Sequence, residues 1–539
     1  MNKKLLLLLA IFCIGSVARA QSVYLPYAYQ FYQKLDSSVY SNQSRFHSSM
    51  KPFLVDDPLI SSQYQSLMNA GVDSLNKRSW VHRKLFQEHL VNIKEEDFTV
   101  FIDFLPDLTA GRDFRNHKTT WLNTRGYQVG GTIGSKFYFY TSGFENQGVF
   151  PDYVNRYIDR NNQTSVYIIP GQSYDRSYGK ATRDWSYVTA LLSYTPNKYL
   201  NFALGQDKTF IGDGYRSVLL SDYATNYPFF KATATLGNVR YMAMWANMQD
   251  PLAPKLSYQD GNRKKWGVFH YLDWNVNNKL SLGFFDSVIW ADKDDAGNKR
   301  GFDFNYINPF VFLRPIEANI GSGDNALIGF TGKYKFVDKA AVYGQFGLDE
   351  FEAKNFLSSN GSSRNKYAWQ LGVRGADLFA VKRLNYLLEI NNAKPYTYTE
   401  TNSIINYAQN AEPLAHPFGA NFREVVGILN YAVGRFNFYG QAEFGHYGLD
   451  QTATDNYGKD IFKLYNQPTK TLGNYTGQGL TTNLYYGEGR VSYLLNPKYN
   501  LRFEVGVLLR QEKNSVTTNN TAMLTFGLRS SFRNLYYDF

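Results

Sequence analysis

Two segments of the chain combine aromatic, charged and glycine residues in a way that suits the binding of a sugar. They are residues 206–230 and 308–317. Aromatic rings can pack on sugar rings, while carboxylates and guanidinium groups hold hydroxyl or acidic groups, and arginine matches a carboxylate in a two-pronged way. The residues expected to bind such a ligand are Asp213, Tyr215, Arg216, Asp222, Tyr227, Phe229, Arg314 and Glu317.

The same two segments also carry apolar residues, which favour a second interpretation. The first contains the apolar sequence Val218-Leu219-Leu220, and the second is apolar around an Arg314–Glu317 pair. A loop with its own apolar residues is expected to fold inward and pack. The alternative is therefore that both are constriction loops whose charges form internal salt bridges.

Other chemistry finds little support in the sequence. His82 and His89 lie seven residues apart, without the four-residue gap and intervening Glu of a zinc protease helix. Gly212-Asp213-Gly214 has no following Gly-Lys-Ser/Thr, so it is not a phosphate-binding loop. His270 and His446 fall in apolar phases and are expected at an interfacial belt. No His–Ser–Asp arrangement stands out, and we expect neither an enzyme nor a metal or other cofactor.

Composition narrows the class of protein. Of the 539 residues, 17% are aromatic and 19% are charged, which excludes a disordered chain. The mean hydropathy is −0.40, and the body of the chain has no apolar run long enough for a spanning helix. The formal net charge is +11, but the basic residues form no run, so nucleic acid is not expected as a partner.

The first twenty residues have the pattern of a secretory signal peptide. Lys3 and Lys4 precede an apolar stretch over Leu5–Ile14, and Ala18-Arg19-Ala20 is a small-x-small cleavage site. The chain's single cysteine, Cys13, lies in this segment. We therefore expect an exported protein without disulfides, with residues 1–20 removed.

From about residue 97 the apolar residues alternate with polar or small ones. In Leu501–Arg510 every odd position is apolar, and 435–444 and 384–391 repeat the scheme. Successive side chains of a strand point to opposite faces, so these runs are amphipathic strands. The polar set, expected to face a lumen, includes Glu389, Glu443, Arg502, Glu504, Arg510 and Arg529.

Short turns alternate with long loops along the whole of residues 97–539. The short turns are at 134–136, 196–198, 237–238, 277–279, 337–339, 380–382, 434–435 and 496–498. The longer connections are at roughly 106–120, 146–183, 207–228, 248–264, 290–325, 349–366, 393–421, 448–481 and 510–520. Eighteen strands with short turns on one side are typical of an outer-membrane barrel, with the short turns periplasmic. We predict an all-β fold, a closed antiparallel transmembrane β-barrel of about 18 strands.

The two ends of the chain complete this prediction. Residues 21–96 show helical spacing, as in 60–75 and 80–93, and form either a plug at the barrel foot or a lid outside it. Leu535, Tyr537 and Phe539 alternate and end in Phe, which resembles the recognition signal of the outer-membrane assembly machinery. Their phase conflicts with that of 522–532, so we expect either a register-shifting bulge or a periplasmic tail. Both termini are expected in the periplasm.

The loop residues resemble a known family. Gly212-Asp213-Gly214…Leu219-Leu220-Ser221-Asp222…Pro228 is similar to the G-x-G…L-L-S-D-x-x-x-x-x-P stretch of the Wzi-type capsule-assembly barrels, and 308–317 resembles a second shared stretch. Similar proteins in gliding bacteria are called RemB. The resemblance implies an eighteen-stranded outer-membrane barrel with periplasmic helices that acts as a surface lectin and holds exported capsular polysaccharide.

We therefore expect a non-catalytic, monomeric protein in the outer membrane of a Gram-negative bacterium. Its expected partners are outer-membrane lipid, lipopolysaccharide, capsular or other surface polysaccharide, and the assembly machinery during insertion. One alternative is a gliding or adhesion protein that works through protein partners in a larger surface complex. A passive diffusion channel is another, and a soluble secreted β-protein is the last.

Overall fold

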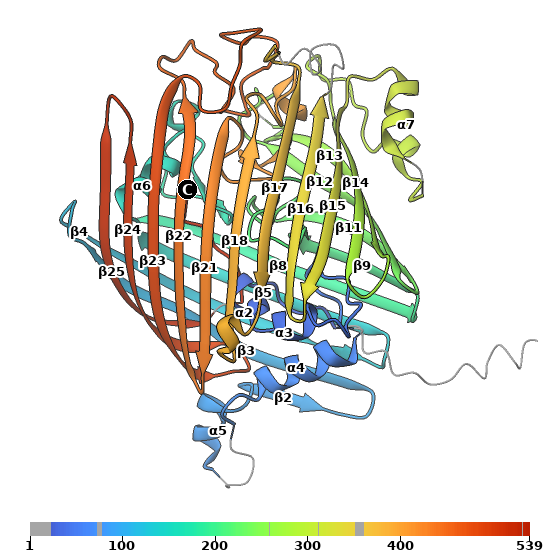
Figure 1. Ribbon diagram of the computed structural model, residues 1–539, viewed down its shortest axis with the longest axis vertical. Helices are drawn as coiled ribbons and strands as arrows, with labels where there is room; N and C mark the ends of the chain where they lie inside the picture. The colour runs from blue at the N-terminus through green and yellow to red at the C-terminus, as the bar shows by residue number, and fades with distance from the viewer. Residues whose placement is uncertain are drawn as a thin grey trace, which may run out of the picture.

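The protein forms a closed antiparallel β-barrel (Figure 1). The computed structural model describes residues 23–55, 57–72, 78–257, 259–310, 312–350, 360–530 and 532–539. Within these ranges eighteen strands follow one another around the barrel in chain order. The barrel closes where the last strand pairs with the first, Met523–Arg529 against Asp107–Asp113. Closure removes the free sheet edge that hydrocarbon could not satisfy.

The barrel strands are β3 (Phe98–Asp113), β4 (Lys118–Ile133), β5 (Phe137–Val149), β8 (Arg183–Asn197), β9 (Leu200–Asp207), β11 (Tyr227–Leu236), β12 (Val239–Asp250), β13 (Arg263–Asn275), β14 (Leu280–Ala291), β15 (Asn325–Val337), β16 (Ala340–Glu350), β17 (Lys366–Gly375), β18 (Leu384–Ala393), β21 (Phe422–Val433), β22 (Phe436–Leu449), β23 (Leu480–Asn496), β24 (Leu501–Lys513) and β25 (Thr518–Ser530).

The predicted alternation sorts the side chains between the two faces of the wall. On β24, Phe503, Val505 and Val507 are exposed on the outside, while Glu504 and Arg510 are buried on the inside. The outer face is thus apolar, as contact with lipid requires, and the inner face is polar. In the described ranges, no helix has both the length and the apolarity needed to cross a membrane.

The eight predicted short turns all lie between consecutive strands. Two of the nine predicted long loops are wrong. Strands β3 and β4 run on into what was predicted as the loop 106–120 and meet in a turn at 114–117, and β24 and β25 do the same at 514–517. Paired strands continue here because each residue keeps its ladder partner, as in Asp113↔Lys118 and Lys513↔Thr518. We call this part of the rim, where short turns stand in place of the predicted long loops, the low rim.

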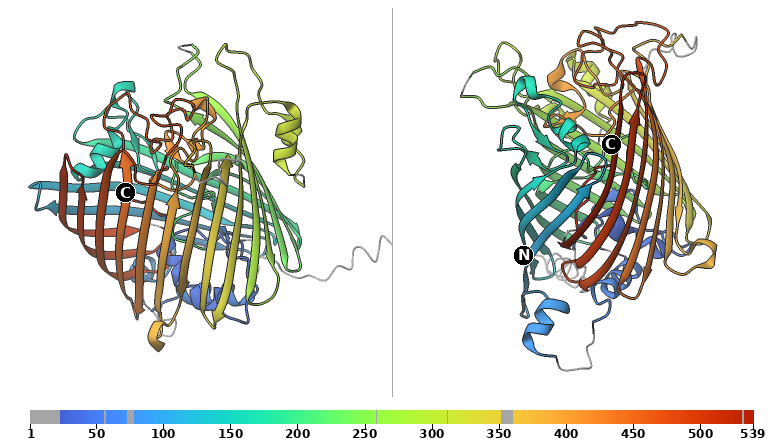
Figure 2. Two further views of the ribbon diagram at one scale, coloured as in Figure 1. Left: turned by 45° about the horizontal axis from the view of Figure 1, so that its top comes forward. Right: turned by 90° about the vertical axis from the view of Figure 1, so that its left-hand side faces the viewer.

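Residues 23–55 fill the barrel foot, and we call them the plug. Helices α2 (Tyr29–Gln33) and α3 (Asp36–Val39) lie inside the lower barrel (Figures 1 and 2). Asp36 forms a buried bidentate pair with Arg374 of β17 (2.8 and 2.9 Å). Strand β1 (Met50–Lys51) pairs with β10 (Phe210–Ile211) of an inward-folded loop.

Two further helices lie below this plug. Helix α4 (Pro58–Met68) packs on it through Ile60 and Met68, which belong to the apolar core of the plug. Helix α5 (Trp80–Phe86) exposes its apolar side. The helix expected over 80–93 ends early, because 91–94 form strand β2 (Val91–Lys94), which pairs with β3. The signal-peptide prediction falls on residues outside the described ranges.

The long-loop side carries smaller elements. Apart from the 3₁₀ helix η3 (Leu378–Ala380), which lies in the short turn between β17 and β18 on the opposite side, they are α6 (Asp152–Ile158), the hairpin β6 (Ile168–Ile169) with β7 (Ser173–Tyr174), α7 (Leu313–Ile320), the hairpin β19 (Ala408–Gln409) with β20 (Glu412–Pro413), and the 3₁₀ helices η1 (Asn162–Thr164), η2 (Phe304–Tyr306) and η4 (Ser403–Ile405). Most of these loops gather over the upper opening (Figure 2).

Candidate functional site

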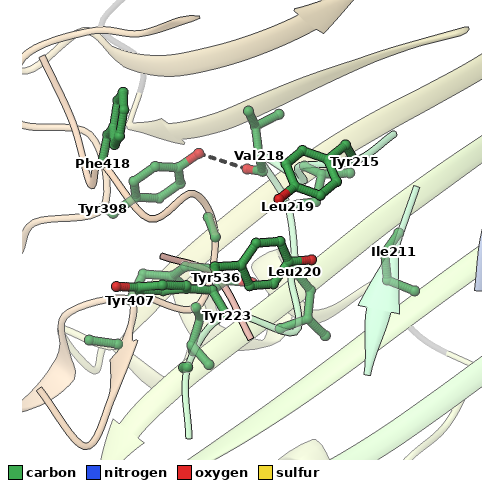
Figure 3. Packing of buried hydrophobic residues seen from close by; sticks show 14 of the residues in the cluster. Ile211, Tyr215, Val218, Leu219, Leu220, Tyr223, Tyr398, Tyr407, Phe418 and Tyr536 are labelled. Atoms are coloured by element: carbon green, nitrogen blue, oxygen red, sulfur yellow. Dashed lines mark hydrogen bonds between the residues drawn. The ribbon is translucent and has the colours of Figure 1, made fainter. Parts of the chain in front are cut away.

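The loop between β9 and β11 folds into the lumen, as its apolar residues predicted. Val218, Leu219 and Leu220 are fully buried, and the hydroxyl of Tyr398 donates to the carbonyl of Val218 (2.7 Å; Figure 3). Burying each such side chain stabilises the loop by roughly 1.5–3 kcal/mol. Gly329 of β15 makes room for this packing, since a Cβ there would overlap Leu219. The loop is therefore a fixed part of the barrel interior.

Arg216 stands at the centre of a buried charge cluster. Its side chain is 1% exposed and lies 3.0 Å from Glu424, 3.4 Å from Glu443 and 3.2 Å from Asp538. Its backbone N–H donates to Glu389 (3.0 Å). One cation thus neutralises carboxylates from two strands and from the end of the chain, which ties the loop to the wall.

All six predicted binding residues of this loop region are buried: Asp213, Tyr215, Arg216, Asp222, Tyr227 and Phe229. Asp213 accepts from the hydroxyl of Tyr40 in the plug (3.0 Å). Asp222 accepts from the hydroxyl of Tyr536 (2.7 Å). The partners of the two carboxylates thus come from within the protein, whereas Tyr215 also lines a cavity that is described below. These partners could not be predicted from the sequence, because they are far away along the chain.

Arg314 and Glu317 lie far from this cluster in the fold. Both belong to α7, which packs on the outside of the barrel wall, and their side chains pair at 2.7 Å. The prediction that 308–317 is a constriction loop is therefore wrong. The structure does not bring the two predicted halves of the binding site together.

The C-terminal tail also enters the lumen. Phe539 is buried, and its carbonyl oxygen accepts from Arg510 (2.9 Å) on the inner face of β24. Tyr215 donates to Asp538 (2.6 Å). In the described residues 532–539 the tail therefore follows neither of the two predicted paths, but folds back into the lumen. The change of phase after 532 marks the place where the chain leaves the sheet.

A cavity of about 230 Å³ lies between this tail and the inner wall, and we call it the wall cavity. Its tyrosines are Tyr29, Tyr153, Tyr215, Tyr439, Tyr486, Tyr536 and Tyr537. Its ionisable lining includes Glu488, Arg490, Arg502, Glu504, Arg529, Arg533 and Asp538. The cavity thus offers aromatic faces beside charged hydrogen-bonding groups, as sites for polar ligands do.

Ion pairs fix the charged side of the wall cavity. Arg529 lies between Asp107 (2.9 Å) and Glu504 (2.7 Å). Arg502 also contacts Glu504 (3.1 Å), and Arg490 contacts Glu488 (3.3 Å). Since each guanidinium carries five N–H donors, these pairs leave donors for a ligand while holding the side chains in place.

A second, more open pocket of about 400 Å³ lies at the low rim, and we call it the rim pocket. Its inward and rim-facing lining includes Arg115, Glu443, Tyr486, Arg510 and Thr521. It opens near the turns 114–117 and 514–517, which are short connections on the long-loop side. Tyr486 lines both the rim pocket and the wall cavity and so stands at their boundary.

A buried carboxylate ties three of the long loops together. Glu412 accepts N–H groups from Gly171 (2.8 Å) and Thr225 (3.0 Å). Burial raises the pKa of Glu412 to about 7. The stability that this group contributes is therefore greatest at low pH and is lost as the pH rises through about 7.

Comparison with solved structures shows which known barrel this architecture resembles. The chain is similar over 93% of its length to Wzi, and covers 98% of that chain, with a TM-score of 0.52 and 13% identity. The chain has the Wzi fold. Wzi is described as an outer membrane protein involved in group 1 capsule assembly in Escherichia coli and as a carbohydrate-binding β-barrel. This confirms the barrel predicted from the sequence and the fold implied by the Wzi-type motifs.

Weaker similarities extend to other barrels. OprD of Pseudomonas aeruginosa aligns with a TM-score of 0.41 and 10% identity, over 79% of this chain and 94% of that chain. OccAB2 of Acinetobacter baumannii aligns with the same TM-score and identity, over 80% and 97%. No protein-family model matches the chain, and no curated protein matches it in sequence.

The sequence predicted several inward-facing residues that line the wall cavity, but it did not predict the cavity itself. Arg502, Glu504 and Arg529 were predicted to face the lumen, and they do. Tyr439 and Tyr486 were missed as site residues. Both are at inward-facing positions of β22 and β23 in the alternating pattern, but inward-facing tyrosines are common in barrels and do not by themselves indicate a site. Among the described residues, no cluster of three or more His, Cys, Asp or Glu is arranged to hold a metal ion.

Proposed function

We propose that this protein is a non-catalytic outer-membrane barrel that binds or anchors surface polysaccharide, capsular polysaccharide in particular. The ligand would enter at the rim pocket and reach the wall cavity. The main observation in support of this proposal is the position of Tyr486. Its ring lies between the open rim pocket and the wall cavity, which is lined by tyrosines and arginines. The carbohydrate-binding description of Wzi, which shares the fold, supports the same ligand class.

The chemistry of the two pockets suits a hydroxyl-rich chain. Tyrosine faces can cover the apolar side of a sugar ring, and guanidinium groups donate several hydrogen bonds in a fixed plane. Thr521 at the rim adds an uncharged donor and acceptor. A carboxylated sugar would find Arg115 there as well.

Replacing Tyr486 by alanine is expected to weaken polysaccharide binding about tenfold, because it removes the ring that both pockets share. Tyr493→Ala is the matched control, since Tyr493 is on the same strand but on the outer face. Affinity would be measured by titrating oligosaccharides from the organism's own surface polysaccharide onto the purified protein in nanodiscs. Equal affinities for the two variants would contradict the proposed site.

The channel alternative is less well supported, because the plug, the inward loop and the tail all occupy the lumen. The gliding or adhesion alternative has one supporting observation. Helix α5 exposes Trp80, Val81 and Leu85 below the barrel foot, where a protein partner could bind. A monomer that binds polysaccharide needs no such partner, so we place this function second.

A further inference from the structure

The loop between β14 and β15 runs down the outer face of the barrel. In Figures 1 and 2 its helix α7 lies outside the wall. Leu313 of α7 belongs to an apolar cluster with Val268, Val288 and Trp290, whose side chains are on outward positions of β13 and β14. The indole N–H of Trp245 on β12 donates to the carbonyl of Tyr306 (2.9 Å). Protein therefore covers this part of the outward wall.

Two phenylalanines of this loop extend an aromatic row of that wall. The outward residues Tyr241, Leu272, Phe284, Phe330 and Phe346 are successive ladder partners across β12–β16. The ring of Phe310 stacks on Tyr241 (6.0 Å), and the ring of Phe312 packs edge-on against Phe284 (5.2 Å). The uncovered members of the row face outward directly beside them, Phe330 being 52% exposed.

The loop turns large apolar side chains outward rather than toward the barrel. Phe304, Phe310 and Phe312 are 74%, 77% and 65% exposed. Its backbone is partly satisfied within the loop, as in the bond from the N–H of Phe310 to Asn308 (3.0 Å). Exposed apolar side chains on a segment that satisfies part of its own backbone hydrogen bonding are typical of an element at a membrane interface.

The part of the wall beneath the loop carries polar residues on its outer face, which explains why the loop covers it. Asp286 and His270 are ladder partners at outward positions, and both are buried. Asp286 accepts the N–H of Leu313 (2.6 Å) at the start of α7. A carboxylate facing hydrocarbon would be costly, so α7 shields this position. His270 was expected at an interfacial belt, and the structure shows it buried at this outward position beside Asp286.

We infer that residues 302–310 and 312–320 form a lipid-binding segment whose Phe304, Phe310 and Phe312 insert among the acyl chains of the outer-leaflet lipid. The continuity of Phe310 and Phe312 with the lipid-facing row carries this inference. It does not depend on polysaccharide binding, because the segment lies on the opposite face of the wall from the wall cavity.

Site-directed spin labelling of the full chain in lipid nanodiscs would test it. The chain's one cysteine is Cys13, in the predicted signal peptide, so Phe310→Cys and Phe312→Cys would each give a single label. Val516→Cys, at an exposed turn on the long-loop side, is the aqueous control, and Phe526→Cys, on the outer face of β25, is the lipid control. Retained gel mobility shifts on heating would show that each variant is folded.

Labels at 310 and 312 are expected to be as accessible to oxygen as the label at 526. Their accessibility to a water-soluble nickel chelate should be several-fold lower than that of the label at 516. Accessibility to the chelate equal to that at 516 would overturn the inference. Labels protected from both reagents in native membranes, but open to the chelate in nanodiscs, would also overturn it, because a protein partner would then cover the segment.

Discussion

Replacing Arg216 by methionine is expected to destabilise the packed interior by about 3–5 kcal/mol, because it leaves buried carboxylates without their cation. Glu424, Glu443 and Asp538 lie within 3.4 Å of the guanidinium. The inward loop and the tail should both loosen, since Arg216 joins them. Hydrogen exchange of the amides of 215–221 should rise sharply, and the denaturant midpoint should fall.

Arg176→Met is the matched control for this variant. Arg176 also pairs with two carboxylates, those of Glu145 and Asp184, but its side chain is 50% exposed. Exposed pairs contribute about 0–1 kcal/mol because water and salt screen them. Similar losses in the two variants would show that the cluster around Arg216 does not hold the interior together.

Removing residues 531–539 is expected to open the lumen. Arg533 and Asn534 line both the wall cavity and a smaller cavity of about 60 Å³, so the tail separates the two. Without the tail, Arg216 and Arg510 also lose partners that hold the interior. Planar-bilayer recordings should show stepwise conductance for the truncated protein and almost none for the full chain.

Tyr537→Phe is the control for this deletion, since it loses the hydrogen bond to Gln172 (3.1 Å) but keeps the tail. Both proteins should be refolded in vitro, because the terminal residues are also predicted to guide assembly in the cell. A truncated protein as silent as the full chain would mean that the plug alone closes the barrel.

The strands were predictable from the sequence because their signals are local. Alternation over 501–510 and turn residues such as Gly434-Arg435 depend only on neighbours in the chain. The path of the tail was not predictable, because the contact of Phe539 with Arg510 and that of Asp538 with Arg216 join distant segments. The wall cavity was missed for the same reason, since its lining comes from the plug, the tail and several strands.

The role of the predicted binding residues shows the same limit. The residue types of Asp213, Arg216 and Asp222 suited a ligand, but the sequence could not tell an external ligand from internal partners such as Tyr40, Glu424 and Tyr536. The apolar Val218-Leu219-Leu220 was the better guide, because burial of such residues leaves the loop no exposed position.

Hydroxyl-radical footprinting of the tyrosines, with and without oligosaccharides of the organism's surface polysaccharide, tests the account most directly. Tyr486 is 5% exposed, so it should be oxidised slowly in the free protein, and bound oligosaccharide should slow this further. The oxidation of Tyr493 on the outer face and of Tyr475 in the loop 450–479 should be unchanged. Slower oxidation of Tyr475 with Tyr486 unaffected, or no protection at all, would contradict a polysaccharide site at the low rim of this barrel.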